Sequence, residues 1–175
     1  MNERPLVFDP AIRAAPGELL DIIARSYAVL VTREPAIWGG ERRNWEDFDR
    51  GVFDHPETLG RCAFVSRLGC EAVGLASYDP RLWPAYGVVG QNCVLPEYRS
   101  RGIGRRQILE ILRRFREAGF EAARVTTSEH PFFQPALRLY KALGFRETGR
   151  PAGGPDARFR LIELEKPSLL EPPLL

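Results

Sequence analysis

Hydrophobic residues recur at helical spacing in three segments of the chain, and each predicts an amphipathic helix. The first is 16–30, where Pro16 and Gly17 suit the helix start. The second is 107–120, with arginines on the polar face, and the third is 135–145, which Gly144 closes. The repeating positions are Leu19, Leu20, Ile23 and Tyr27 in the first segment and Ile108, Ile111, Leu112 and Phe115 in the second. A shorter helix is expected near Trp45–Phe53, after a polar loop that contains glycines.

Alternating or continuous apolar runs rich in β-formers predict the strands. A hairpin over 61–79 is expected to turn at Arg67–Gly69. The other predicted strands are 5–8, 88–95, 123–128, 145–149 and 157–166. The last residues, 167–175, read PSLLEPPLL and are expected to form a proline-rich tail.

The order of these elements predicts an α/β (α+β) domain with a mixed, mostly antiparallel sheet. Strand, helix and strand in the middle imply two parallel strands joined by a right-handed crossover. Hairpins on either side imply antiparallel neighbours. A length of 175 residues fits one domain, which we place at 1–166, followed by the tail at 167–175.

Composition narrows the classes of protein that the chain can belong to. A net charge of +2 is too small to indicate nucleic acid binding, and no apolar run is long enough to span a membrane. The start MNERPLVFDP lacks the features of a signal peptide, so a cytoplasmic location is expected. Cys62, Cys70 and Cys93 form no CxxC pair and are odd in number, which argues against both a metal site and disulfides.

The stretch VLPEYRSRGIGRRQ, residues 94–107, places arginines and glycines between a predicted strand and a predicted helix. Unpaired N–H groups and the helix dipole at such a helix start attract anions. Gly102 and Gly104 let a phosphate approach the backbone, and neighbouring arginines add charge-assisted hydrogen bonds. A pyrophosphate site is therefore expected. A nucleotide-binding domain is a weaker alternative, since GxxxxGK[ST] is absent and GxGxxG is incomplete.

Two motifs resemble the GNAT superfamily of acyl-CoA-dependent N-acetyltransferases. Arg99, Gly102 and Gly104 match its Gln/Arg-x-x-Gly-x-Gly/Ala motif for acyl-CoA, and PALRLYKALGF resembles its late helix, with Tyr140 four residues before Gly144. The resemblance covers about residues 60–165. It implies a single GNAT-like domain, with helices on both faces of the sheet and a central parallel pair splayed around the CoA pantetheine.

The resemblance also implies roles for individual residues. The backbone of Val94 and Leu95 would pair with the pantetheine amides, and a backbone N–H there would polarise the thioester carbonyl. Tyr140 would protonate the departing thiolate, although packing of its ring in the helix is the alternative. The family's cofactor-contacting asparagine is replaced by Phe133, within the run HPFFQP. The residues expected at the pyrophosphate are Arg99, Ser100, Arg101, Gly102, Ile103, Gly104 and Arg105.

The sequence therefore predicts an N-acetyltransferase that moves an acetyl group from acetyl-CoA to a primary amine of a small molecule or protein, by direct attack in a ternary complex. The alternative is a non-catalytic acyl-CoA-binding sensor or interaction module of the same fold. The acceptor and the oligomeric state, for which a homodimer is one option, are left open.

No general base stands out from the sequence. Glu97, Glu129 and His130 lie nearest the predicted strand ends, where a salt bridge or a helix cap is the simpler interpretation. Cys93 is interpreted as packing because no histidine partner is evident. Aromatic residues in or beside the N-terminal helices and the 80–87 loop are either core or an acceptor pocket: Trp38, Trp45, Trp83 and Tyr86.

Overall fold

The computed structural model describes residues 4–170, whose strands form one seven-stranded sheet in the order β1-β2-β3-β4-β5-β7-β6. The strands are β1 Leu6–Pro10, β2 Ala63–Leu68, β3 Glu71–Asp79, β4 Tyr86–Val94, β5 Ala122–Ser128, β6 Arg146–Gly149 and β7 Leu161–Lys166. The α-helices are α1 Glu18–Arg33, α2 Pro35–Trp38, α3 Glu41–Asp54, α4 Ile103–Glu117 and α5 Gln134–Ala142. Short 3₁₀ turns lie at Ala11–Arg13, Gly60–Cys62, Pro96–Tyr98 and Pro131–Phe133.

The sheet is mixed, as predicted. Strands β1 and β2, β2 and β3, β5 and β7, and β6 and β7 pair antiparallel. Strands β4 and β5 pair in parallel over Tyr86–Val88 and Ala122–Arg124. Because the helix between them is α4, the predicted strand–helix–strand crossover is confirmed.

Contacts divide the chain into two compact units. One contains the chain up to Tyr78 together with Gln91–Ile108, and the other contains Asp79–Gly90 together with the chain from Leu109 onward. Strand β4 and helix α4 each run from one unit into the other. The expected division into a domain at 1–166 and a tail at 167–175 stays a prediction, and residues 171–175 lie outside the described part. Within that tail Leu169 is buried, and its N–H bonds the Glu121 carbonyl at 2.9 Å.

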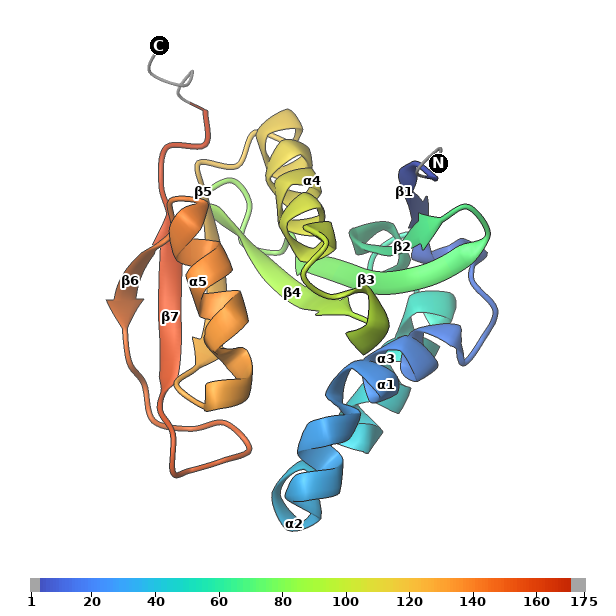
Figure 1. The fold of residues 1–175 in the computed structure, drawn as a ribbon. Helices are drawn as coiled ribbons and strands as arrows, with labels where there is room; N and C mark the ends of the chain where they lie inside the picture. The colour runs from blue at the N-terminus through green and yellow to red at the C-terminus, as the bar shows by residue number, and fades with distance from the viewer. Residues whose placement is uncertain (1–3, 171–175) are drawn as a thin grey trace. The chain divides into compact units, whose positions relative to one another are not determined.

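In the first unit, α1 and α3 lie side by side and pack against one face of the strands (Figure 1). Alternate residues of β2 and β3, such as Val65 and Leu75, point toward these helices. The buried residues on this face are Ala11, Ala14, Leu19, Ile22, Ile23, Trp45, Val52, Ala63, Val65, Leu75, Cys93 and Leu95. The Asp49 carboxylate of α3 accepts the N–H groups of Gly17, at 2.9 Å, and Leu20, at 3.2 Å, at the start of α1. This bond caps α1 from a neighbouring helix.

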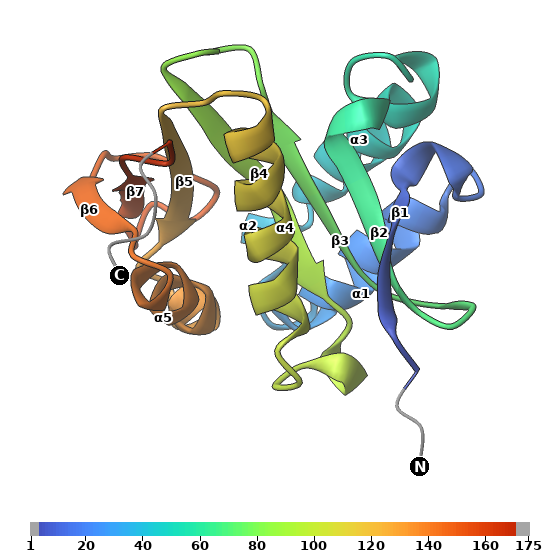
Figure 2. The same ribbon diagram turned by 90° about the horizontal axis from the view of Figure 1, so that it is seen from above.

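In the second unit, β5, β7 and β6 are neighbouring strands of the sheet, and β5 contacts α5 (Figures 1 and 2). Phe115 of α4 packs on Phe120, with ring centroids 4.9 Å apart. A Cβ at Gly87 of β4 would lie 2.4 Å from the Phe115 ring, so the ring occupies the space that a side chain would need. Glycine at this strand position therefore allows the helix to approach closely.

Several element boundaries differ from those expected. The hairpin turns at Gly69–Cys70 and not at Arg67–Gly69, because Arg67 and Leu68 still pair with β3. The short helix predicted at 45–53 begins at Glu41, and the four-residue helix α2 lies where a loop was expected. Helix α4 begins at Ile103 rather than at residue 107, because Gly102 at φ 74° ends the preceding loop and Ile103 already joins the apolar face. The last strand begins at Leu161 rather than at residue 157.

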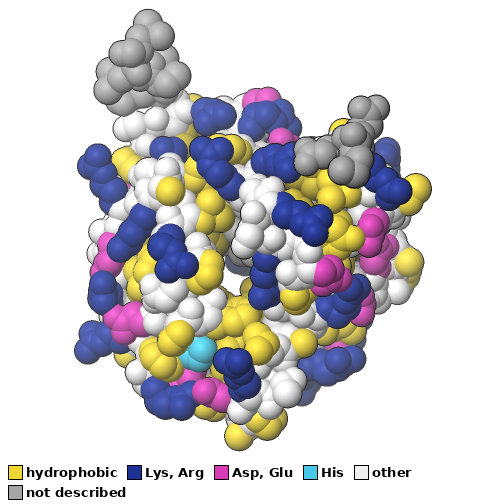
Figure 3. Space-filling view, viewed as in Figure 1, with side chains coloured by type: hydrophobic (Ala, Val, Ile, Leu, Met, Phe, Trp, Pro, Cys, Tyr) yellow, Lys and Arg dark blue, Asp and Glu magenta, His cyan; other side chains and the backbone are white. Residues whose placement is uncertain are grey.

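The surface agrees with the small net charge. Figure 3 shows Lys and Arg side chains scattered over the viewed face among acidic and hydrophobic ones, not gathered into a single patch. No helix among residues 4–170 is long and apolar enough to cross a membrane.

Candidate functional site

The predicted cofactor segment forms the connection from β4 to α4. Ser100 and Gly102 adopt left-handed backbone, with φ of 62° and 74°. The N–H of Arg106 makes a hydrogen bond to the Gly102 carbonyl at 3.1 Å. The N–H groups of Ile103, Gly104 and Arg105 therefore precede the helical ladder, as the anion-binding expectation requires. A Cβ at Gly102 would meet no protein atom within 4 Å, so the positive φ and not crowding explains glycine there.

The loop arginines make bonds that the sequence did not reveal. Arg99 donates from Nε to the Val94 carbonyl at 3.2 Å and from Nη2 to the Ser26 carbonyl of α1 at 2.6 Å. Arg101 donates to the Glu97 carbonyl at 3.2 Å and stacks over Tyr98. Arg105 is exposed. The phosphate role of these arginines stays a prediction, and in the structure Arg99 and Arg101 also anchor the loop.

Two further contacts fix the start of the loop. Glu97, one of the three base candidates, forms an ion pair with Arg25 of α1 at 2.5 Å. The Tyr98 hydroxyl is hydrogen-bonded to Glu71 of β3. This bond is the main cause that raises the pKa of Tyr98, and loss of solvent around the hydroxyl is the second. The loop is therefore held to both a helix and a strand of the first unit.

The N–H groups of Val94 and Leu95 are the two predicted hydrogen-bond donors to the thioester carbonyl, and the structure distinguishes between them. The Leu95 N–H donates to the Val73 carbonyl of β3 at 3.0 Å and is therefore already bonded. Successive N–H groups of a strand point to opposite sides, so the N–H of Val94 points away from β3. Of the two candidates, Val94 is the one whose N–H is directed toward the other edge of β4.

Cys93 behaves as a packing residue, as interpreted from the sequence. Its side chain is buried, and its Sγ lies 3.6 Å from the Leu75 carbonyl. Burial raises the pKa of the thiol to about 12. A thiol with that pKa is protonated at neutral pH and is a poor nucleophile.

Tyr140 lies on α5 with 5% of its surface exposed. Its ring packs edge-on against Phe145 at 5.7 Å between centroids. The N–H groups of Leu143 and Phe145 bond the Tyr140 carbonyl, and Gly144, at φ 88°, closes the helix. The tyrosine is held firmly at the end of its helix, and both a packing role and a proton-donor role are compatible with that position.

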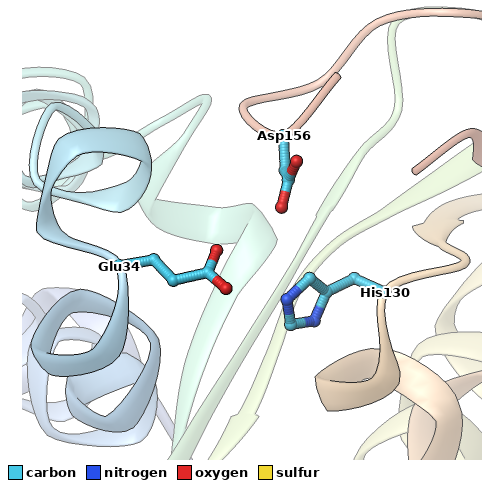
Figure 4. A group of neighbouring side chains, drawn as sticks. All are labelled: Glu34, His130 and Asp156. Atoms are coloured by element: carbon cyan, nitrogen blue, oxygen red, sulfur yellow. The ribbon is translucent and has the colours of Figure 1, made fainter. Parts of the chain in front are cut away.

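The remaining base candidates are engaged within the second unit. Nδ1 of His130 accepts the Phe132 N–H at 3.1 Å, which places the proton of the neutral ring on Nε2. Figure 4 shows the Asp156 carboxylate directed toward this ring. Glu129 pairs with Arg150 and accepts the Arg160 N–H at 3.3 Å. These contacts fit the structural interpretation of His130 and Glu129.

The departure at HPFFQP forms a compact aromatic turn. Phe133, for which the resemblance implied an asparagine, makes edge contacts with the rings of Phe132 and His130. The next side chain, Gln134, donates to the Glu129 carbonyl at 3.1 Å. This bond ties the first residue of α5 to the chain before the turn.

The aromatic residues considered for an acceptor pocket have different surroundings. Trp38 and Trp45 are buried, and Trp45 stacks on Tyr27. Trp83 is 62% exposed and donates from Nε1 to the Ala118 carbonyl. The Arg124 guanidinium lies 3.6 Å from the centroid of Tyr86.

Comparison with known proteins gives a family match and several structural neighbours. The sequence model of the Acetyltransferase (GNAT) family matches residues 25–145. No sequence among the curated proteins matches the chain. A putative acetyltransferase of the GNAT family from Desulfovibrio desulfuricans aligns with a TM-score of 0.70 at 16% identity, covering 93% of this chain and 99% of its own.

Two other solved structures show the same fold. An acetyltransferase from Thermus thermophilus aligns with a TM-score of 0.63 at 23% identity, covering 95% of this chain and 99% of its own. A putative streptothricin acetyltransferase from Bacillus anthracis str. Ames, solved in complex with acetyl coenzyme A, aligns with a TM-score of 0.53 at 18% identity, covering 60% of this chain and 61% of its own.

Proposed function

Because the chain belongs to the Acetyltransferase (GNAT) family, we propose that it moves an acetyl group from acetyl-CoA to a primary amine of a small molecule or a protein. The observation that carries this proposal is the loop from Arg99 to Gly104. It follows the 3₁₀ turn Pro96–Tyr98 after β4 and leads into α4, where N–H groups and basic side chains suit a pyrophosphate. We place Ser100, Arg101, Gly102, Ile103 and Arg105 around that group.

The backbone of β4 would orient the other end of the cofactor. Extended ligands add to strand edges through main-chain hydrogen bonds, and we assign the pantetheine amides to the backbone at Val94 and Leu95. The Leu95 N–H donates to the Val73 carbonyl of β3, and the Leu95 carbonyl already accepts the Tyr98 N–H at 2.9 Å. Leu95 would therefore contribute only the second lone pair of that carbonyl. The Val94 N–H is then the donor for the thioester carbonyl oxygen.

The reaction is direct transfer in a ternary complex. The neutral amine nitrogen attacks the thioester carbon, and the carbonyl electron pair moves onto oxygen, where the Val94 N–H stabilises it. When the tetrahedral intermediate collapses, the C–S bond breaks and the Tyr140 hydroxyl gives its proton to the thiolate. The proton of the attacking amine leaves to an ordered water, because Glu97, Glu129 and His130 are engaged elsewhere.

Tyr140→Phe tests the assignment, since it keeps the ring and removes only the hydroxyl. Thiol release from acetyl-CoA is followed with a panel of primary amines, and CoA affinity is measured by calorimetry on the same samples. Turnover should fall about 10²- to 10⁴-fold while CoA affinity stays constant. Unchanged turnover would leave Tyr140 as packing. CoA binding without thiol release for any amine would favour the sensor alternative instead.

A further inference from the structure

Gln107 is a polar residue on the buried face of α4. Its neighbours one turn away on that face, Ile103 and Ile111, are apolar, and Gln107 itself is 0% exposed. Within the described part of the chain its Oε1 is buried with no hydrogen-bond partner. An unsatisfied buried polar atom is destabilising, and leucine or methionine at this position would avoid that cost. Packing alone therefore does not explain why a glutamine occupies this position.

The amide nitrogen makes two hydrogen bonds to the sheet. Nε2 donates to Ser66 Oγ of β2 at 2.9 Å and to the Cys93 carbonyl of β4 at 3.3 Å. The strand between them carries Gly74, which is paired with Ser66. A Cβ on Gly74 would lie 2.7 Å from Nε2 and 2.6 Å from the Cys93 oxygen. Gly74 therefore leaves the space through which the Gln107 side chain reaches the Cys93 carbonyl, and Ser66 provides the second acceptor for its amide nitrogen.

The Cys93 carbonyl shares a planar peptide with the Val94 N–H. In a trans peptide the C=O and the N–H point in opposite directions, so holding the oxygen fixes the direction of the N–H. A hydrogen bond to the oxygen also polarises the peptide and makes its N–H a better donor. The next peptide is held as well, because the Val94 carbonyl accepts from Arg99 and the Leu95 N–H donates to Val73.

We propose that Gln107 is a positioning residue that aims and polarises the Val94 N–H at the thioester carbonyl oxygen. The inference rests on the proposed function, in which negative charge develops on that oxygen. A donor held in place before the reaction stabilises the transition state without having to reorganise. Gln107 itself touches neither substrate nor cofactor and loses no proton.

Gln107→Met is the test, because methionine matches the length of glutamine and lacks the N–H donor. With acetyl-CoA and an active amine, kcat should fall about 10-fold, less than when an oxyanion donor is deleted outright. The Kd for CoA should stay within about twofold, since CoA has no thioester carbonyl for the donor to bind. In isotope-edited infrared spectra, the carbonyl stretch of bound [1-¹³C]acetyl-CoA should shift less from its solution frequency than in the wild type.

Two further variants separate positioning from stability. Ile108→Val removes a methylene from the adjacent, fully buried residue and should lower the melting temperature without changing the carbonyl shift. Ser66→Ala removes the second partner of Nε2 and should act like Gln107→Met, with a smaller effect, which keeps the test open if Gln107→Met does not fold. Unchanged kcat and carbonyl shift in both Gln107→Met and Ser66→Ala would overturn the proposal. A parallel loss of kcat, CoA affinity and melting temperature would also overturn it.

NMR on the CoA-free protein separates this inference from the proposed function. The ¹³C carbonyl resonance of Cys93 and the amide resonance of Val94 should both move in Gln107→Met. If they do not move, the positioning role is wrong even in an active acetyltransferase. If they move but the wild type neither binds CoA nor releases thiol, the proposed function is wrong, and with it the catalytic meaning of the contact.

Discussion

Replacing Gly74 with alanine adds a methyl group where the structure leaves no room. The new Cβ would lie 2.6 Å from the Cys93 oxygen and 2.7 Å from Gln107 Nε2, both inside van der Waals contact. The first of these atoms belongs to the backbone of a central strand and cannot turn away. Overpacking of this kind costs about 1–3 kcal/mol. Loss of the Gln107 bond adds about 1 kcal/mol, and the lower entropy of the unfolded alanine chain returns about 0.4–1 kcal/mol.

The net expectation is a loss of about 2 kcal/mol in the free energy of unfolding. Gly51→Ala is the matched control, because it changes the unfolded chain in the same way. Its Cβ would lie 3.0 Å from a Leu59 methyl group, which can move, and alanine favours the helix, so it should be neutral or stabilise by up to about 1 kcal/mol. Both are measured by urea unfolding with tryptophan fluorescence. If Gly74→Ala proves as stable as Gly51→Ala, Gln107 and the Cys93 carbonyl do not pack as closely as this reasoning requires.

Further predictions concern Asp49, Cys93 and Arg99. Asp49→Ala should lower the free energy of unfolding by about 1–2 kcal/mol, because α1 loses its cap. Asp47→Ala removes an exposed carboxylate of the same helix and should change the free energy of unfolding little. Equal effects of the two variants in urea unfolding would exclude the cap. The Cys93 thiol, with a pKa of about 12, should resist iodoacetamide at pH 8 while the exposed Cys70 reacts. Because folding raises the pKa of the Cys93 thiol, the protonated thiol contributes its full stabilisation below pH ~8.5, and this stabilisation should be lost as the pH rises toward 12. In Cys93→Ala, this part of the pH dependence of the free energy of unfolding should disappear. Arg99→Ala should weaken CoA binding more than binding of a pantetheine fragment without the pyrophosphate, and equal losses by calorimetry would remove Arg99 from the phosphate site.

Local patterns predicted the elements whose residues repeat regularly. The apolar stripes of α1, α4 and α5 and the β-rich runs were sufficient to predict the mixed sheet and its crossover. The family match confirms the resemblance that the two motifs indicated. Helix α2 was missed because four residues are too few to show a period. The partner of Arg99 was also beyond reach, because the Ser26 carbonyl lies 73 residues earlier and backbone carbonyls leave no mark in a sequence. Gln107 is visible in the sequence as a polar residue within an apolar stripe, but its role can be inferred only from its contacts near Ser66 and Gly74.

The division of the chain at β4 and α4 limits how the protein can be cut. Neither unit is a single continuous segment, since each takes one part of β4 and one part of α4. A fragment ending at Tyr78 would lack the strand that follows β3 in the sheet order and the helix turn that carries Gln107. A fragment beginning at Leu109 would lack the first half of β4, with which β5 pairs. Two genes encoding the halves would therefore have to overlap across residues 79–108, and recombination with a related chain would have to exchange β4 and α4 together.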